Sequence, residues 1–169
     1  MKVTHSKEHR MEKELKNLIK ESKKSLKTAE NKIEELSGDF SEEVSEFWND
    51  LKGHFSKVND KLKQAYDDFD SGESKLDAHL SMMEARDKLE KVKKSAEEFA
   101  LTASKKTKEE YSMASLKAHL AKMEAEDKWE ETRKELSHTY AKSKVEVENM
   151  AKKAGKEINE IFVKLTEMV

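Results

Sequence analysis

The chain has 169 residues and carries 34 Lys or Arg against 36 Asp or Glu, a formal net charge of −2. It contains no Pro and no Cys, and Ala, Glu, Leu, Lys and Arg make up about half of it, a composition typical of long helices and coiled coils. The lack of Cys excludes disulfide frameworks and Cys-ligated zinc, and no run approaches the roughly 20 apolar residues of a membrane span. The small net charge argues against a simple nucleic-acid binder, which usually carries a basic surplus.

We expect an all-α fold, an elongated antiparallel helical bundle or coiled coil of three or four long helices, in a single domain covering 1–169. In the first expected helix, about 4–37, apolar and small residues recur at alternating steps of three and four and so form one stripe. Gly38 can adopt the left-handed conformation that ends a helix. Asp39 with Glu42 forms a capping-box-like start for the next one.

The second expected helix, 40–70, carries the stripe that is richest in aromatic residues and should hold the best-packed core. Its stripe runs through Phe40, Val44, Phe47, Leu51, Phe55, Val58, Leu62, Ala65 and Phe69. Asp70-Ser71-Gly72 should end this helix, because Gly72 can also adopt the left-handed conformation. Ser71 or Ser74 is available to cap the helix that follows.

The stretch 73–154 contains neither Gly nor Pro, so the chain here forms either two helices, about 73–103 and 107–168, or one continuous helix. As a single helix the stretch would extend about 120 Å, too far for the first two helices to cover. The polar run 103–110 is the candidate turn, because Thr107 and Glu110 make a second capping-box pattern in it.

A 16-residue unit occurs twice: the segment 75–90 aligns without gaps on 115–130, with 10 of 16 positions identical. The copies would face the same way on one unbroken helix and would lie on antiparallel neighbours if the chain folds back. The repeated pattern Ala-His-Leu-x-x-Met-Glu-Ala-x-Asp-Lys resembles the repeat of uncharacterised bacterial coiled-coil proteins of a stress-response family. This resemblance implies a bacterial helical protein with no catalytic residues to carry over.

Two histidines and two aspartates hold equivalent places in the two copies. His79 and His119 would form a paired pH-sensitive, haem or metal site if the copies meet. Alternatively, each flanks the apolar stripe and makes a local hydrogen bond. Asp87 and Asp127 lie near the edge of the stripe, where a carboxylate can fix the register through a Lys on a neighbouring helix. Alternatively, both simply lie on the surface.

Two other histidine spacings are candidates for metal binding. His5 and His9 are four residues apart on one helix face, but no third ligand lies near them in the sequence. Glu135 and His138 match the Glu-x-x-His spacing of di-iron carboxylate bundles, although the chain has no second copy of that motif. Because nucleophile constellations and Gly-rich phosphate loops are also missing, we expect no enzymatic activity, no cofactor and no metal.

The sequence instead predicts a non-enzymatic interaction protein, a stress-related adaptor or scaffold that forms a homo-oligomer or docks on a protein partner. We expect it in the cytoplasm, because residues 1–10 lack the apolar core of a secretory signal. The residues expected to take part in contacts are His79, Met83, His119, Met123, Trp129, Ile158, Ile161, Phe162 and Leu165. The alternative is a reversible lipid-surface binder with amphipathic helices, similar to exchangeable apolipoproteins, whose helices are typically punctuated by Pro.

Overall fold

The computed structural model describes residues 2–72, 75–104 and 113–169, with side chains from Arg10 onward. The helices are α1 (Lys2–Leu36), the short 3-10 turn η1 (Ser37–Asp39), α2 (Glu42–Ser71), α3 (Lys75–Ser104), α4 (Met113–Ala125), α5 (Trp129–Lys142) and α6 (Lys144–Met168). No strand occurs in the described ranges, so the predicted all-α fold is confirmed for them.

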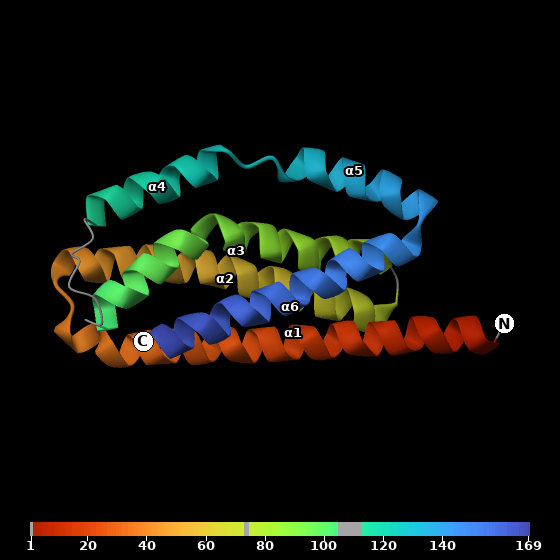
Figure 1. Cartoon of the computed structure of the whole chain (residues 1–169), viewed down its shortest axis with the longest axis horizontal. Helices are drawn as coiled ribbons and strands as arrows, with labels where there is room; N and C mark the ends of the chain where they lie inside the picture. The colour runs from red at the N-terminus through yellow and green to blue at the C-terminus, as the bar shows by residue number, and fades with distance from the viewer. Residues whose placement is uncertain (1, 73–74, 105–112) are drawn as a thin grey trace.

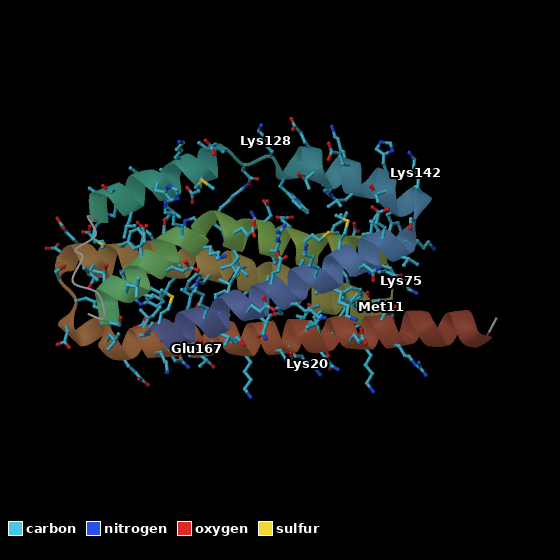
Figure 2. All side chains as sticks on the ribbon, in the orientation of Figure 1. Met11, Lys20, Lys75, Lys128, Lys142 and Glu167 are labelled. Carbon is cyan, nitrogen blue, oxygen red and sulfur yellow. The ribbon has the colours of Figure 1, made fainter. Side chains whose placement is uncertain are left out.

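Four helices lie side by side along the long axis of the molecule, and two cover them from outside. Figure 1 shows α1, α2, α3 and α6 together, while α4 and α5 follow each other along the outside of α3. α1, α3 and α6 run in one direction, and α2 runs in the opposite one. Charged side chains such as Lys20 and Lys128 project outward (Figure 2), because the apolar stripes of the helices turn toward one another.

Both ends of α2 lie close to their predicted positions, but the cap at its start differs. Gly72 has a φ of +69°, and its N–H donates to the Asp68 carbonyl at 3.2 Å, which confirms the predicted glycine stop. Ser41, not Asp39, caps the start, since its Oγ accepts a hydrogen bond from the backbone N–H three residues later at 3.3 Å. Gly38 lies in η1 and does not adopt the predicted left-handed conformation.

The expected final helix, 107–168, is divided into α4, α5 and α6. Because α4 returns along α3, the alternative of one continuous helix from 73 to 168 is wrong. The two additional breaks, at 126–128 and at Ser143, contain neither Gly nor Pro and are not predicted by the pattern.

Ser143 ends one helix and starts the next. Its N–H donates to the Thr139 carbonyl at 2.7 Å, and its Oγ accepts a hydrogen bond from the Glu146 N–H at 3.3 Å. A serine in this position satisfies backbone groups at a helix start, so the chain can reverse here into α6. The predicted caps at Ser74 and Thr107 lie outside the described residues.

The main hydrophobic core lies between α1, α2, α3 and α6, and the three buried residues of α4 (Met113, Leu116 and Leu120) join it. α2 buries the predicted stripe from Phe47 to Phe69, and Phe99 of α3 packs against its rings. The C-terminal residues expected to contact a partner are also buried in the chain: Ile158, Ile161, Phe162 and Leu165. These side chains therefore pack against other helices of the same chain. An apolar stripe in the sequence indicates that a helix face is buried, but it does not show which helices bury it.

Candidate functional site

Residues 113–142, which we call the arm, comprise α4, the turn at 126–128 and α5, and lie against α2, α3 and α6. The arm has few buried side chains for its length. Its buried side chains are Met113, Leu116, Leu120, Trp129 and Leu136. By contrast, α3, which is also 30 residues long, buries thirteen. Segments with few buried apolar side chains open locally at a low free energy, so the arm is well suited to move away from the bundle.

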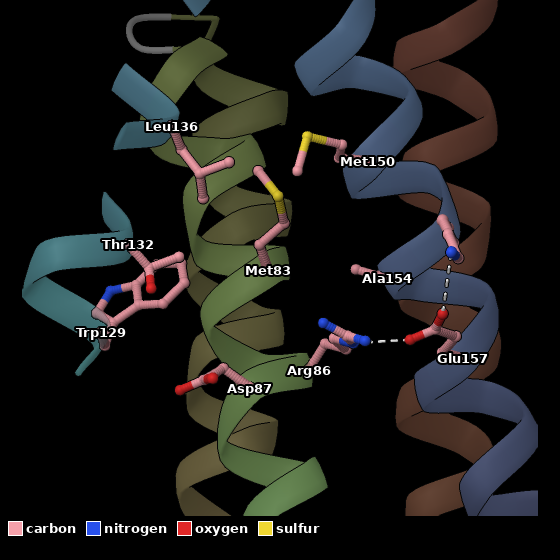
Figure 3. A pocket seen from close by; sticks show the side chains of 10 residues that line it. Met83, Arg86, Asp87, Trp129, Thr132, Leu136, Met150, Ala154 and Glu157 are labelled. Atoms are coloured by element: carbon pink, nitrogen blue, oxygen red, sulfur yellow. Dashed lines mark hydrogen bonds and ion pairs between the residues drawn. The ribbon is translucent and has the colours of Figure 1, made fainter. Parts of the chain in front are cut away.

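A second hydrophobic cluster, separate from the main core, lies beneath α5. Its buried residues are Leu80 and Met83 of α3, Trp129 and Leu136 of α5, and Val147 and Ala154 of α6. The cluster is not completely filled, because a pocket of about 240 Å³ opens between the three helices. Figure 3 shows Met83, Leu136 and Met150 around this space. Two of the residues predicted to make contacts, Met83 and Trp129, line the pocket.

We call the part of this cluster that belongs to the bundle the α3–α6 groove. It consists of Leu80, Met83, Val147 and Ala154. These four side chains are between 0% and 7% exposed, whereas Met150, at the edge of the pocket, is 41% exposed. The groove is therefore an apolar surface that α5 occupies, with an unfilled pocket beside it.

Ion pairs within the chain line the edge of the pocket. Arg86 Nε lies 2.7 Å from Glu157 Oε2, and Arg86 Nη2 lies 3.2 Å from Glu90 Oε1. Lys153 Nζ lies 4.0 Å from the second carboxylate oxygen of Glu157. Such exposed pairs contribute about 0–1 kcal/mol each. These charges offset one another, so apolar contact is the main interaction that the pocket offers.

Lys91 of α3 joins the two copies of the repeat. Its Nζ lies 3.2 Å from Asp87 Oδ2, one turn away, and 2.6 Å from Asp127 Oδ1 in the arm, which confirms the predicted cross-helix Lys. Asp127 Oδ1 also accepts a hydrogen bond from the Trp129 N–H, two residues later, at 3.0 Å. This contact is a side-chain turn that satisfies the first backbone N–H of α5, whose N-cap residue, Lys128, has no side-chain cap. Lys91 lowers the pKa of Asp127. Burial opposes the charge of Lys91, but the two aspartates outweigh it and raise the pKa of this ammonium.

The second copy of the repeat bends where the first does not, and its aspartate has different neighbours. In the first copy, Asp87 is followed four residues later by Lys91, a pairing that supports a continuous helix. In the second copy, the residue four positions after Asp127 is Glu131, which repels the carboxylate. Asp127 instead pairs with Lys91 across the helices and with the Trp129 backbone, and these contacts compete with helical hydrogen bonds at the bend.

The Asp127→Ala variant is expected to loosen α5 by about 1–2 kcal/mol, because it removes the hydrogen bond to the Trp129 N–H and a partly exposed ion pair. Amide hydrogen exchange of 129–142 should then accelerate by about 5- to 30-fold. Asp87→Ala is the matched control, since it removes the equivalent aspartate and leaves the hydrogen bond at the start of α5 in place. Equal acceleration in both variants would contradict the role of Asp127 at the start of α5.

His79 is the most buried of the histidines whose side chains are described, at 2% exposed. Its ring lies between Phe69 of α2, with ring centroids 5.1 Å apart, and Tyr140 of α5, at 6.2 Å. Nδ1 donates a hydrogen bond to the Lys75 carbonyl, whereas Nε2 is buried with no hydrogen-bond partner. Burial lowers the pKa of His79, against the smaller opposing effects of the Lys75 carbonyl and Glu12.

The equivalent histidine of the second copy, His119, lies on α4 and is partly exposed. The Lys91–Asp127 pair fixes how α4 lies along α3. At 1.5 Å per residue, His79 is about 18 Å from this pair in one direction and His119 is about 12 Å from it in the other. At about 30 Å apart, the two histidines do not form a paired site. The alternative of a local hydrogen bond applies to His79.

A contact that the sequence did not predict holds α4 to α2. His54 Nε2 lies 2.8 Å from Glu124 Oε1. Burial lowers the pKa of His54, although Glu124 acts in the opposite direction. Next to it, Met123, one of the residues predicted to make contacts, is partly buried. No signal in a single sequence links two positions that are so far apart along the chain.

The remaining metal candidates do not come together with other ligands where the structure describes them. Glu135 and His138 are both exposed on α5, and the side chains of His5 and His9 lie outside the described ones. Among the side chains that are described, no group of three or more His, Asp or Glu is arranged to hold a metal ion.

None of the described helices combines the length and the apolar character needed to cross a membrane. Comparison of the chain with protein-family models, with curated proteins and with solved structures finds no match in any of the three. The features that bear on function are therefore those of the chain itself: the arm, the α3–α6 groove and the buried His79.

Proposed function

We propose that the chain is a non-enzymatic protein-interaction module, an adaptor or scaffold of the cytoplasm, whose docking face is the α3–α6 groove. The four long helices α1, α2, α3 and α6 act as an elongated bundle that holds the groove in shape. α5 occupies the groove in the closed state. When the arm lifts, α5 of a second copy takes its place, so that two chains exchange arms and form a homo-oligomer.

The observation that carries the proposal is the unfilled pocket of about 240 Å³ between α5 and the groove. Trp129 and Leu136 are the two buried side chains of α5, all of whose residues are described. They are seven residues apart and therefore lie on one helix face, the spacing that helices use when they dock in grooves. A second copy carries the same two anchors, so their fit to Met83 and Ala154 is equally available between chains.

No catalytic step is part of this proposal. Arg86, Glu157 and Lys153 at the edge of the pocket pair with one another, whereas catalysis needs an acid, a base or a nucleophile directed at a substrate. The apolar lining suits contact with a helix, and the proposal needs no cofactor.

A fluorescent peptide of residues 127–142 is the direct test of docking. It should bind the wild-type chain weakly, because the tethered α5 competes at an effective concentration of about millimolar order. A chain with Trp129→Ala loosens its own α5 and should bind the wild-type peptide at least about tenfold more tightly, a difference of about 1.4 kcal/mol. Fluorescence anisotropy measures both affinities.

The matched control is the same peptide with Trp129→Ala and Leu136→Ala, which should bind neither chain. A wild-type peptide that does not bind the Trp129→Ala chain overturns the proposal. Flotation of the chain with anionic vesicles, together with that failure, would favour the lipid-surface alternative, since Arg133 and Lys134 give α5 basic residues beside its apolar face.

A further inference from the structure

We infer that His79 is an acid-sensitive latch for α5: uptake of one proton by its buried Nε2 releases α5 and opens the α3–α6 groove. The inference rests on the proposed function for what the opening admits, whereas the release itself is a property of the single chain. Three features carry it. They are the position of the ring between α2 and α5, the buried nitrogen without a partner, and the thin burial of α5.

The hydrogen bond at Nδ1 determines which neutral form of the ring is present. The Lys75 carbonyl can only accept, so Nδ1 carries the proton and Nε2 is bare. A proton added to Nε2 of His79 would create a charged N–H in a buried place where that atom has no hydrogen-bond partner. An unpaired buried charge is strongly unfavourable, so the protonated ring needs water or an acceptor that the closed arm does not supply.

The charged groups that face His79 do not offset this burial. Glu12 of α1 favours the charged ring, but it lies 3.2 Å from Nζ of Lys75 on α3, which opposes the charge. α2 presents an aromatic ring. α5 contributes Tyr140, and Lys144 of α6 lies 5.8 Å from the centre of that ring. Burial is the largest of these effects, and it lowers the pKa of His79.

The direction of the pH effect follows from this lowering. While α5 is closed, His79 takes up a proton only below its ordinary range; once α5 opens, water reaches the ring and its pKa returns to about 6.5. The open state then binds more protons than the closed state, so the closed state loses stability as the pH falls below about 6.5. Each further pH unit raises the ratio of open to closed chains by up to about tenfold, until the closed state also binds the proton.

Protonation of His79 should displace α5 and not α2, because α2 has many more buried side chains than α5. Phe69 is one of eight buried side chains on α2, whereas α5 buries only two. His54, beneath α4, does not oppose this effect: burial lowers the pKa of His54 more than Glu124, 2.8 Å away, raises it. Acid is therefore expected to act on α5 through His79, and variants of His79 separate its effect from that of His54.

Hydrogen exchange with mass spectrometry on the full chain tests the latch. Rates are compared at about pH 7.4 and 5.4 after correction for intrinsic exchange, and residues 129–142 should exchange about tenfold faster at the lower pH. Residues 47–69 of α2 should keep their protection. Parallel loss of protection in 47–69 would mean global unfolding and would overturn the inference.

Variants at the repeated histidine positions identify the group that titrates. His79→Leu should abolish the acid response of 129–142, and His79→Gln, which keeps a polar side chain, should do the same if the first variant does not fold. His119→Leu, at the same position of the second copy, should retain the response. An acid response that persists in a folded His79 variant overturns the latch. If the 127–142 peptide does not bind the Trp129→Ala chain, docking is excluded and the exchange result still stands, so the two failures are distinguishable.

Discussion

Replacing Phe99 by Ala is expected to lower the free energy of unfolding by about 3–5 kcal/mol. The ring is fully buried on α3, and its centroid lies 5.4 Å from that of Phe47, 5.8 Å from Trp48 and 5.8 Å from Phe40. Truncation would leave a cavity and remove aromatic contacts on three sides. Because domains of this size have a total stability of about 5–15 kcal/mol, the urea midpoint, followed by circular dichroism, should fall steeply.

The control for this variant is a truncation on the surface of the same bundle. Val163 on α6 is 40% exposed, so Val163→Ala should change the free energy of unfolding by no more than about 0.5 kcal/mol. Phe99→Leu keeps an apolar side chain and should fall between the two. A Phe99→Ala chain with the urea midpoint of the wild type would show that the core does not depend on the aromatic contacts between α2 and α3.

The first three helices can be predicted to within a residue or two because each depends on a local pattern. The predicted ranges 4–37, 40–70 and 73–103 correspond to Lys2–Leu36, Glu42–Ser71 and Lys75–Ser104. An apolar stripe and a glycine stop are both properties of neighbouring residues. The pattern is less informative about caps, since Ser41 and Asp39 are both good candidates and the structure uses only Ser41.

The bend in the arm depends on contacts between distant segments, and local patterns do not contain it. The two copies of the repeat are alike in sequence, yet 75–90 is one continuous helix and 115–130 bends at 126–128. Asp127 leaves the helix to meet Lys91 on α3, and that contact exists only after the chain has folded back. The same holds for His79, whose burial comes from helices that are remote in sequence.

The candidate site could be predicted in part. The repeat draws attention to Met83 and Trp129, and both line the pocket. The third wall comes from α6, where Ala154 gives no sequence signal of its own. Phe162, further along the same helix, was expected to contact a partner and is buried in the main core instead. One helix therefore contributes to two separate clusters, and only the packing of its neighbours decides which residue goes to which.

Gly155 of α6 packs tightly against α1 and α3, and a larger residue there should be unfavourable. A Cβ at this position would lie 2.9 Å from Met82 Cε and 3.2 Å from Leu18 Cβ. The same position accepts a hydrogen bond at its carbonyl from the buried Ser22 Oγ, at 3.2 Å, so α1 and α6 cannot separate without losing this bond. Gly155→Val is therefore expected to lower the free energy of unfolding by about 1–3 kcal/mol through overpacking.

The matched control is a second glycine in a helix interior, which has open space around it. A Cβ at Gly53 of α2 would meet nothing within 4 Å, and Ala is a better helix former than Gly, so Gly53→Ala should raise the free energy of unfolding by about 0.5–1 kcal/mol. Urea unfolding of both variants measures the two effects, which have opposite signs. If Gly155→Val were as stable as Gly53→Ala, the close approach of α1 and α6 would not be required for the fold, because helix propensity alone would then account for both results.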